Sequence, residues 1–210
     1  MQSKDTPQPE LVFGRFFPEH TVKMCLDLWK AHGFKFIVSK KRKSKFGDYR
    51  YQHSNDSHTI TVNGDLNQYA FLVTYLHEVA HLITHKKHGW KVSPHGREWK
   101  ECFKETMNPF LALNIFPDTL QKAITSYMHN PGASSCSDPS LMITLQSFDK
   151  KQDGLVYLES ISVGKSFNFR GRIFTKKELK RTRSLCEENA TGRRYLIAEI
   201  ARVKVIDHQH

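Results

Sequence analysis

Cysteines are few in this sequence, and none of them forms a CxxC pair. The chain of 210 residues has four cysteines, widely spaced along it: Cys25, Cys102, Cys136 and Cys186. This spacing disfavours both a secreted fold held together by disulfides and a cysteine-rich zinc finger. We therefore expect reduced thiols with a structural role.

Long apolar runs are also absent. The first ten residues are polar, unlike a secretory signal. No run approaches the roughly 18 apolar residues that span a bilayer. We expect a soluble, cytoplasmic protein that does not bind membranes.

Acidic residues are outnumbered by basic ones. The 32 lysines and arginines exceed the 21 aspartates and glutamates, which gives a formal net charge of +11. Such an excess predicts a polyanionic partner, nucleic acid first. We expect DNA, single-stranded or damaged, and association with the nucleoid. RNA is the alternative, because composition does not separate the two polyanions.

The hydrophobic pattern divides the chain into two parts. Helical spacing of apolar residues predicts helices over 20–32, 66–85, 95–107 and 118–127, and alternation predicts strands at 34–38, 49–53 and 59–63. After a linker-like stretch at 130–135, alternation predicts short strands at 155–158, 166–169, 172–174 and 195–200. We expect an α+β fold with a small antiparallel sheet in the first part. The expected divisions are a flexible segment (1–18), a first domain (19–133) and a small, basic, β-rich module (134–210).

The longest predicted helix carries an HExxH motif, His77-Glu78-Val79-Ala80-His81. Histidines four residues apart share a helix face, so both imidazoles can reach one metal ion. Glu78 lies about 100° around the helix, from where its carboxylate can approach a metal-bound water. The pattern is typical of zinc-assisted peptide hydrolysis.

A catalytic zinc site usually has three protein ligands, so a third is expected downstream. His85 lies about 12 Å along the helix from His77, too far to share the ion. His88 requires an immediate chain reversal. His95 follows a loop and precedes a glycine, which makes it the best geometric choice, with His88 next.

The segment from His77 to Trp99 resembles the SprT family of zinc metallopeptidase-like proteins. The family pattern is HExxH, about a dozen residues, and then His-Gly-x-Glu-aromatic, which here reads His95-Gly96-Arg97-Glu98-Trp99. The resemblance covers roughly residues 20–128. It implies a zincin-like helical metalloprotease core that binds one Zn²⁺ through His77, His81 and His95, with Glu78 as the general base.

The resemblance also implies a function. Eukaryotic members are associated with DNA-activated proteolysis of proteins crosslinked to DNA. We therefore expect a gated zinc metalloendopeptidase that acts on proteins at or crosslinked to DNA. The alternative is a nucleic-acid-binding or transcription-associated protein with a structural or proteolytically silent zinc site. Glu78 favours catalysis, because a structural site needs no carboxylate beside its ligands.

The C-terminal part departs from the family pattern. Many SprT-like proteins end in a zinc ribbon with two CxxC pairs, whereas this chain has single cysteines there, which implies a degenerate, metal-free β module. Two basic runs predict contacts with phosphates, without sequence preference. The residues are Lys40, Lys41, Arg42 and Lys43 in the first domain, and Arg170, Arg172, Lys176, Lys177, Arg181 and Arg183 in the module.

Overall fold

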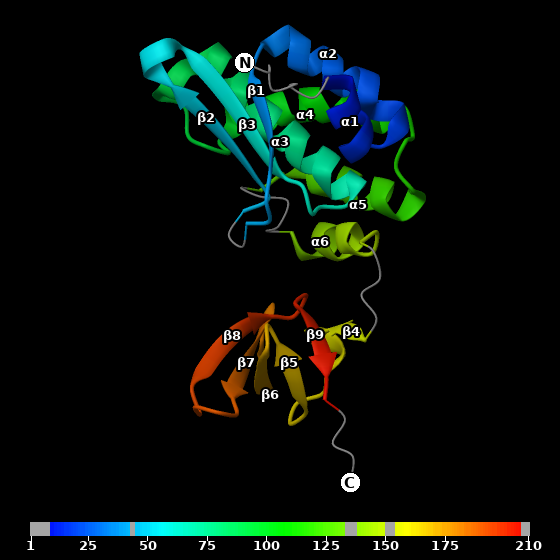
Figure 1. The fold of residues 1–210 in the computed structure, drawn as a ribbon, viewed down its shortest axis with the longest axis vertical. Coiled ribbons are helices and arrows are strands. Elements are labelled where there is room, and N and C mark those ends of the chain that lie inside the picture. Colours follow the sequence, from blue (N-terminus) through cyan, green and yellow to red (C-terminus); the bar gives the residue numbers. More distant parts are fainter. Residues whose placement is uncertain (1–8, 43–44, 133–137, 150–153, 207–210) are drawn as a thin grey trace, which may run out of the picture. The chain divides into compact units, whose positions relative to one another are not determined.

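The computed structural model describes residues 9–42, 45–132, 138–149 and 154–206. The chain forms two compact units, residues 1–149 and 150–210 (Figure 1). The first unit contains α1 (Pro9–Phe16), α2 (Val22–His32), β1 (Lys35–Ser39), β2 (Gly47–Gln52), β3 (Ser57–Asn63), α3 (Gln68–His88), α4 (Arg97–Ala112), α5 (Asp118–His129) and α6 (Pro139–Gln146). The second contains β4 (Leu155–Tyr157), β5 (Ser166–Phe169), β6 (Arg172–Lys180), β7 (Arg183–Glu188), β8 (Arg194–Ala198) and β9 (Arg202–Val205). The predicted α+β class is confirmed.

Helix α3 is the centre of the first unit. Its N-terminus is capped by Asn67, whose side-chain oxygen accepts hydrogen bonds from the backbone N–H groups of Tyr69 and Ala70. The helix packs against β2, β3 and α4, so its middle is enclosed on all sides and Leu76 and Val79 are fully buried. Within the described residues, no helix combines the length and apolar character needed to cross a bilayer.

The three-stranded sheet beside α3 is mixed, which corrects the predicted antiparallel sheet. The strand order is β1-β3-β2, in which β1 runs parallel to β3 and β2 runs antiparallel to it. Strand β3 takes the central place because its Ile60 and Val62 are fully buried, whereas neither outer strand has a buried residue. Strand β2 is therefore an edge strand, and it packs against α3.

Helices extend beyond the predicted limits at two places. Residues 9–16, expected to be flexible, form α1, because Phe13 and Phe17 are buried and pack their rings against Tyr75 of α3. Helix α4 continues through Pro109 to Ala112, whereas we expected it to end at residue 107, before this proline. The buried Phe110 anchors this last turn in the core.

The two units divide between Asp149 and Lys150, whereas we had placed the boundary after residue 133. The difference is α6, whose Leu141 and Leu145 belong to the core of the first unit. The side-chain amide of Asn67 donates to the carbonyl of Leu145 at 2.8 Å and to Asp149 at 2.6 Å. Helix α6 is therefore held by the residue that caps α3.

The second unit is an antiparallel sheet with the strand order β4-β9-β5-β6-β7-β8. Phe167 and Phe174 are buried in its core. Lys176 lies two residues after Phe174 on the same face of β6 and is only 4% exposed. Its ammonium donates to Glu199 and to the carbonyl of Leu158, each at 2.9 Å. The predicted contact of Lys176 with nucleic acid is therefore wrong, because the charge is buried and paired.

Replacing Lys176 by alanine should destabilise the second unit by about 3–5 kcal/mol, because it leaves the Glu199 carboxylate buried without a partner. The neighbouring Lys177 pairs with Glu187 at 3.3 Å on the exposed face, so Lys177→Ala should cost less than about 1 kcal/mol. Urea unfolding of the full chain, with hydrogen exchange of β6 and β7 as the local probe, measures both. Equal losses from the two variants would contradict this assignment.

Candidate metal centre

Three histidines from two segments meet at one point. His77 and His81 lie one turn apart on α3, and His95 lies in the connection to α4 with a left-handed φ of 60°, which is uncommon for a residue with a side chain. The Nε2 atom of His77 is 3.2 Å from those of His81 and His95, and the latter two are 2.8 Å apart. Across the described residues, these three form the one group of histidine, cysteine or acidic side chains able to hold a metal ion.

The geometry of this group fits a metal ion. A tetrahedral zinc ion with bonds of about 2.0–2.1 Å to nitrogen holds its ligand atoms roughly 3.3 Å apart, close to the separations observed. The three Nε2 atoms turn toward one another, and the buried His77 Nδ1 has no hydrogen-bond partner among the described residues. Three imidazoles suit zinc, and they leave a fourth position for water or substrate.

The surroundings of the three histidines favour neutral imidazoles, the form that binds a metal ion. Burial, followed by the proximity of His81 and His95, places the pKa of His77 well below its usual value. Burial and then His95 lower the pKa of His81 to about 3, and burial lowers the pKa of His95. The three nitrogens are therefore unprotonated at neutral pH, as metal binding requires.

Lowering the pH from 7 to 5 should remove the stability that the neutral His81 imidazole contributes to the metal-free protein. In the unfolded chain His81 titrates near 6.5, above its folded pKa of about 3, so the unfolded state takes up more protons. The stability contributed by the neutral imidazole is complete above pH 6.5 and decreases as the pH falls. His81 alone should account for about 1–2 kcal/mol at pH 5.

Chelator-treated protein, unfolded by urea at each pH, provides the measurement. Carboxylates also titrate in this range, so His81→Gln is the matched comparison. The wild type should show the steeper loss of stability, and identical slopes would count against a depressed pKa.

The other candidate ligands lie apart from this group. His85 packs against Tyr51 and Trp90, with ring centroids 4.4 and 4.6 Å away. His88 is the last residue of α3 and is exposed. Neither belongs to the group able to hold a metal, so the geometry favours His95 among the alternatives that spacing had left open.

Trp99 lies against all three histidines. Its ring centroid is 4.6 Å from that of His77, 4.7 Å from that of His95 and 5.2 Å from that of His81, and its other neighbour is Phe103. Trp99 is fully buried and so also serves as a core residue. The same ring also restricts the orientation of the three imidazoles.

Glu78 is enclosed by the start of β2. The backbone N–H of Tyr49 hydrogen bonds to its carboxyl group, and Gly47 lies so close that an added Cβ would stand 2.5 Å from Glu78 Oε1. Burial, and then the charge of Asp48, raise the pKa of Glu78 to about 8, although the Tyr49 N–H, Arg42 and Lys45 act in the opposite direction. A carboxyl group with a pKa near neutrality is suited to proton transfer.

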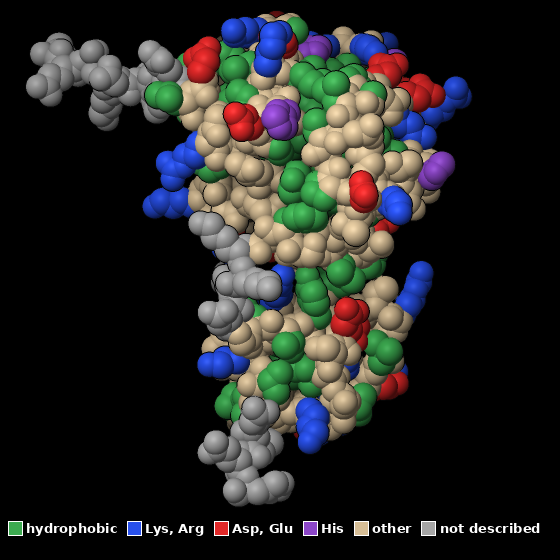
Figure 2. All heavy atoms as spheres, turned by 90° about the vertical axis from the view of Figure 1, so that its right-hand side faces the viewer, with side chains coloured by type: hydrophobic (Ala, Val, Ile, Leu, Met, Phe, Trp, Pro, Cys, Tyr) green, Lys and Arg blue, Asp and Glu red, His purple; other side chains and the backbone are tan. Residues whose placement is uncertain are grey.

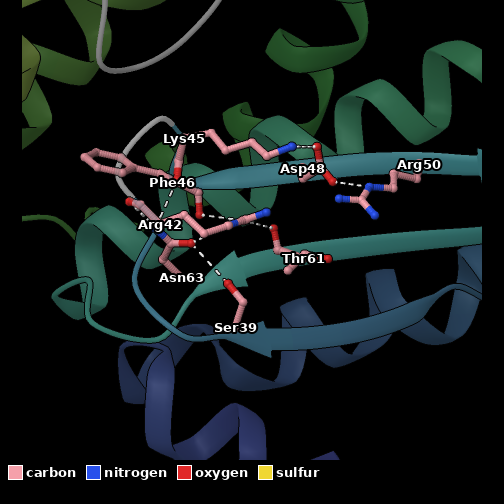
Figure 3. Close-up of polar contacts among 8 residues, drawn as sticks. All are labelled: Ser39, Arg42, Lys45, Phe46, Asp48, Arg50, Thr61 and Asn63. Atoms are coloured by element: carbon pink, nitrogen blue, oxygen red, sulfur yellow. Dashed lines mark hydrogen bonds and ion pairs between the residues drawn. The ribbon is translucent and has the colours of Figure 1, made fainter.

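A polar network fixes the start of β2 (Figure 3). Arg42 Nε donates to Asn63 Oδ1 at 2.7 Å, and the Asn63 side-chain amide donates to the carbonyl of Lys45 at 3.0 Å. Asn63 is buried, with 1% of its surface exposed, and its backbone N–H donates to the carbonyl of Phe46 at 2.8 Å. Arg42, predicted to contact nucleic acid, thus joins the ends of β2 and β3 and supports the strand that lines Glu78.

In the zinc metallopeptidase expected from the sequence, replacing Gly47 by alanine should reduce peptide hydrolysis by about 10²-fold while leaving zinc bound. The new methyl group would meet Glu78 Oε1 at 2.5 Å and Thr74 Cγ2 at 2.6 Å, and a displacement of about 1 Å at a catalytic group costs roughly that factor. The measurements are kcat/KM on a peptide substrate and zinc content. Gly14→Ala is the control, because nothing lies within 4 Å of its added Cβ. Unchanged kcat/KM in Gly47→Ala would contradict the packing argument.

A cavity of about 380 Å³ opens beside the histidines and Glu78. Tyr69, Tyr75 and Arg97, polar residues that could stabilise an oxyanion, are not among its lining residues. Tyr75 is fully buried and its hydroxyl donates to the carbonyl of Cys25, while Arg97 pairs with Glu101. The lining residues are Gly47, Asp48, Tyr49, His77, Glu78, His81, Thr84, His85, Gly89, Trp90, Val92, Ser93, Pro94 and His95.

The remaining residues predicted to contact nucleic acid differ in whether their charges form ion pairs with acidic side chains. Arg172 pairs with Glu188, Lys177 with Glu187, and Lys41 with Asp65. Lys43 lies outside the described residues. Among the residues that the structure describes, four of the predicted contacts are exposed and form no ion pair: Lys40, Arg170, Arg181 and Arg183. On the face drawn in Figure 2, the described Lys and Arg side chains are interspersed with Asp and Glu.

The chain matches a known protein family. The model of the SprT-like family matches residues 15–121, just over half of the chain. The match includes the sheet, α3 and the three histidines. No curated protein and no solved structure matches the chain.

Proposed function

Because the chain belongs to the SprT-like family, with a metallopeptidase-like domain at residues 15–121, we propose that it is a zinc-dependent metalloendopeptidase. The observation that carries the proposal is the meeting of three imidazole Nε2 atoms beside a cavity that also contains Glu78. A structural zinc site would fill its fourth position with another side chain. Within the described residues no fourth ligand joins the group.

Each residue of the centre has a distinct role in this proposal. His77, His81 and His95 would hold the ion, which would supply Lewis-acid chemistry for the hydrolysis of a peptide bond. Glu78 takes the proton from the attacking water and passes it to the leaving amine. Gly47 and the Tyr49 N–H hold the Glu78 carboxyl group in place, and Trp99 fixes the imidazoles.

We also propose that the substrates are proteins at or crosslinked to DNA, and that DNA gates the activity. The net charge of +11 and the exposed cations Arg170, Arg181 and Arg183 support recruitment by a polyanion. An ungated peptidase would endanger other proteins in the same compartment. Single-stranded or damaged DNA is the proposed partner, and RNA is the alternative for the test to distinguish.

The test is cleavage of a DNA-binding protein, purified free of nucleic acid, by the full-length, zinc-loaded chain. Reactions contain no added nucleic acid, single-stranded DNA, or RNA of the same length, and cleavage is followed by gel and mass spectrometry. We expect DNA-stimulated cleavage that chelation abolishes and zinc restores.

Three other outcomes would change the proposal. Equal cleavage with and without nucleic acid would rule out gating. Stimulation by RNA alone would change the partner. A protein that binds zinc and DNA but cleaves nothing would be a nucleic-acid-binding protein with a silent site.

A further inference from the structure

Four aromatic rings form a continuous shelf that leads away from the metal centre. We call Tyr49, Tyr51, His85 and Trp90 the aromatic shelf. Trp90 follows the end of α3, and its ring centroid is 4.6 Å from that of His85 and 5.8 Å from that of Tyr51. Although it touches both rings, Trp90 is 71% exposed. A large apolar side chain held in one place but open to water is typical of a binding surface.

The aromatic shelf reaches the metal ligands through Tyr49. The Tyr49 ring lies parallel to that of His81, with an interplanar angle of 5° and centroids 6.5 Å apart, and it is 6.1 Å from His85. Its hydroxyl is 3.0 Å from His58 Nδ1, which fixes the ring from the other side. Tyr49, His85 and Trp90 all line the cavity that contains Glu78. A group bound on the shelf would thus lie beside the reacting bond.

The chemistry of the cavity identifies the kind of group that fits. Its described lining contains no lysine or arginine, and its charged side chains besides histidine are Asp48 and Glu78. A nucleotide bound there would meet no lysine or arginine of the lining for its phosphate and would occupy the space next to the metal ligands. Val92 and Pro94 extend the lining with apolar surface. These features favour an uncharged, apolar side chain over a nucleotide.

We propose that the aromatic shelf is a subsite for a planar aromatic side chain, phenylalanine, tyrosine or tryptophan, of the bound peptide. An aromatic side chain gains both burial and ring contacts with Trp90 and His85, whereas an aliphatic one gains burial alone. The subsite rests on the proposed function, since it assumes that a peptide occupies the cavity. It makes Trp90 a residue that determines specificity rather than a catalytic one.

The test measures binding and needs no hydrolysis. The zinc-loaded, full-length Glu78→Gln protein is titrated with fluorescein-labelled peptides. The peptides of one set differ only in carrying Phe, Leu, Ala or Lys at a single position, and separate sets place this position at different points along the peptide. Anisotropy gives each Kd. At one position we expect the Phe peptide to bind about tenfold more tightly than the Ala peptide.

Changes at Trp90 decide whether the preference comes from the shelf. Added to Glu78→Gln, Trp90→Ala should reduce the ratio to about twofold or less, while Trp90→Phe keeps most of it. Leu113→Ala, which removes an exposed apolar side chain outside the cavity, should leave the ratio unchanged. The proposal would be overturned if the ratio were unchanged in Trp90→Ala or if the protein showed no preference at any position. It would also be overturned if Trp90→Ala weakened the binding of single-stranded DNA and not the preference for the Phe peptide. Because Glu78→Gln is used throughout, a wild type that binds these peptides but fails to cleave them would contradict only the peptidase function.

Discussion

Replacing Glu78 by glutamine should reduce peptide hydrolysis by roughly 10²–10⁴-fold, the contribution of a positioned general base. The amide has nearly the same shape as the carboxyl group, so it can keep the space beside Gly47. It cannot accept the proton of the attacking water. The three imidazoles are untouched, so the variant should bind zinc as the wild type does. The measurements are kcat/KM on a peptide and zinc content per chain.

Glu105→Gln is the matched control for this change. Glu105 makes an exposed ion pair with Lys87 at 2.9 Å and is not a lining residue of the cavity, so its loss should leave kcat/KM within about twofold. A Glu78→Gln protein with full activity would exclude Glu78 as the base. If both variants and the wild type were equally inactive with zinc bound, the binding-protein alternative would gain support.

The sequence predicted the elements whose signals are local. Apolar spacing and the glycine at 89 marked α3, and Gly33 marked the end of α2, where it adopts the left-handed conformation. The HExxH motif placed two histidines on one face of α3 because its spacing matches the helical repeat. His95 was selected by loop length and by the family pattern, and the fold brings it to the same point.

Features that depend on tertiary packing were harder to predict. Alternation in β1 and β2 indicates strands, but it does not indicate that β3 inserts between them. Helix α6 had a usable signal, since Asp138 precedes Pro139 and caps the helix by accepting from the N–H of Leu141. The linker-like composition just before it obscured this signal. The attachment of α6 to Asn67 joins residues about 80 positions apart, which no local pattern contains.

The charge pattern of β6 led to an incorrect prediction for Lys176, also because burial depends on the fold. Lys176 is two residues after Phe174, so strand alternation already placed it on the buried face. We had counted its charge with that of its exposed neighbours. No sequence pattern assigned Gly47 a role beside Glu78 or Trp90 a role beside His85. Their importance depends on how close the fold brings them, as the packing of Gly47 against the Glu78 carboxyl group shows.

Replacing His95 by alanine should weaken zinc binding by roughly 10²–10³-fold. Zinc sites with four ligands bind with about 10–16 kcal/mol, which is about 2.5–4 kcal/mol for each ligand. The two remaining imidazoles belong to His77 and His81 on one helix, and their Nε2 atoms are 3.2 Å apart. They can still bind the ion weakly. Competition with a chromophoric chelator at pH 7 gives both affinities. Hydrolysis should be lost with the metal at low zinc concentration.

His88→Ala is the control, because His88 was the second choice for the third ligand and lies exposed at the end of α3. Its removal should leave the zinc affinity unchanged. Excess zinc should partly reload His95→Ala, and the thermal stability of that variant should rise only at the higher zinc concentration, since binding stabilises the folded state by mass action. A larger loss of affinity in His88→Ala than in His95→Ala would mean that the loop rearranges around the ion. The group formed by His77, His81 and His95 would then not be the metal centre of the working protein.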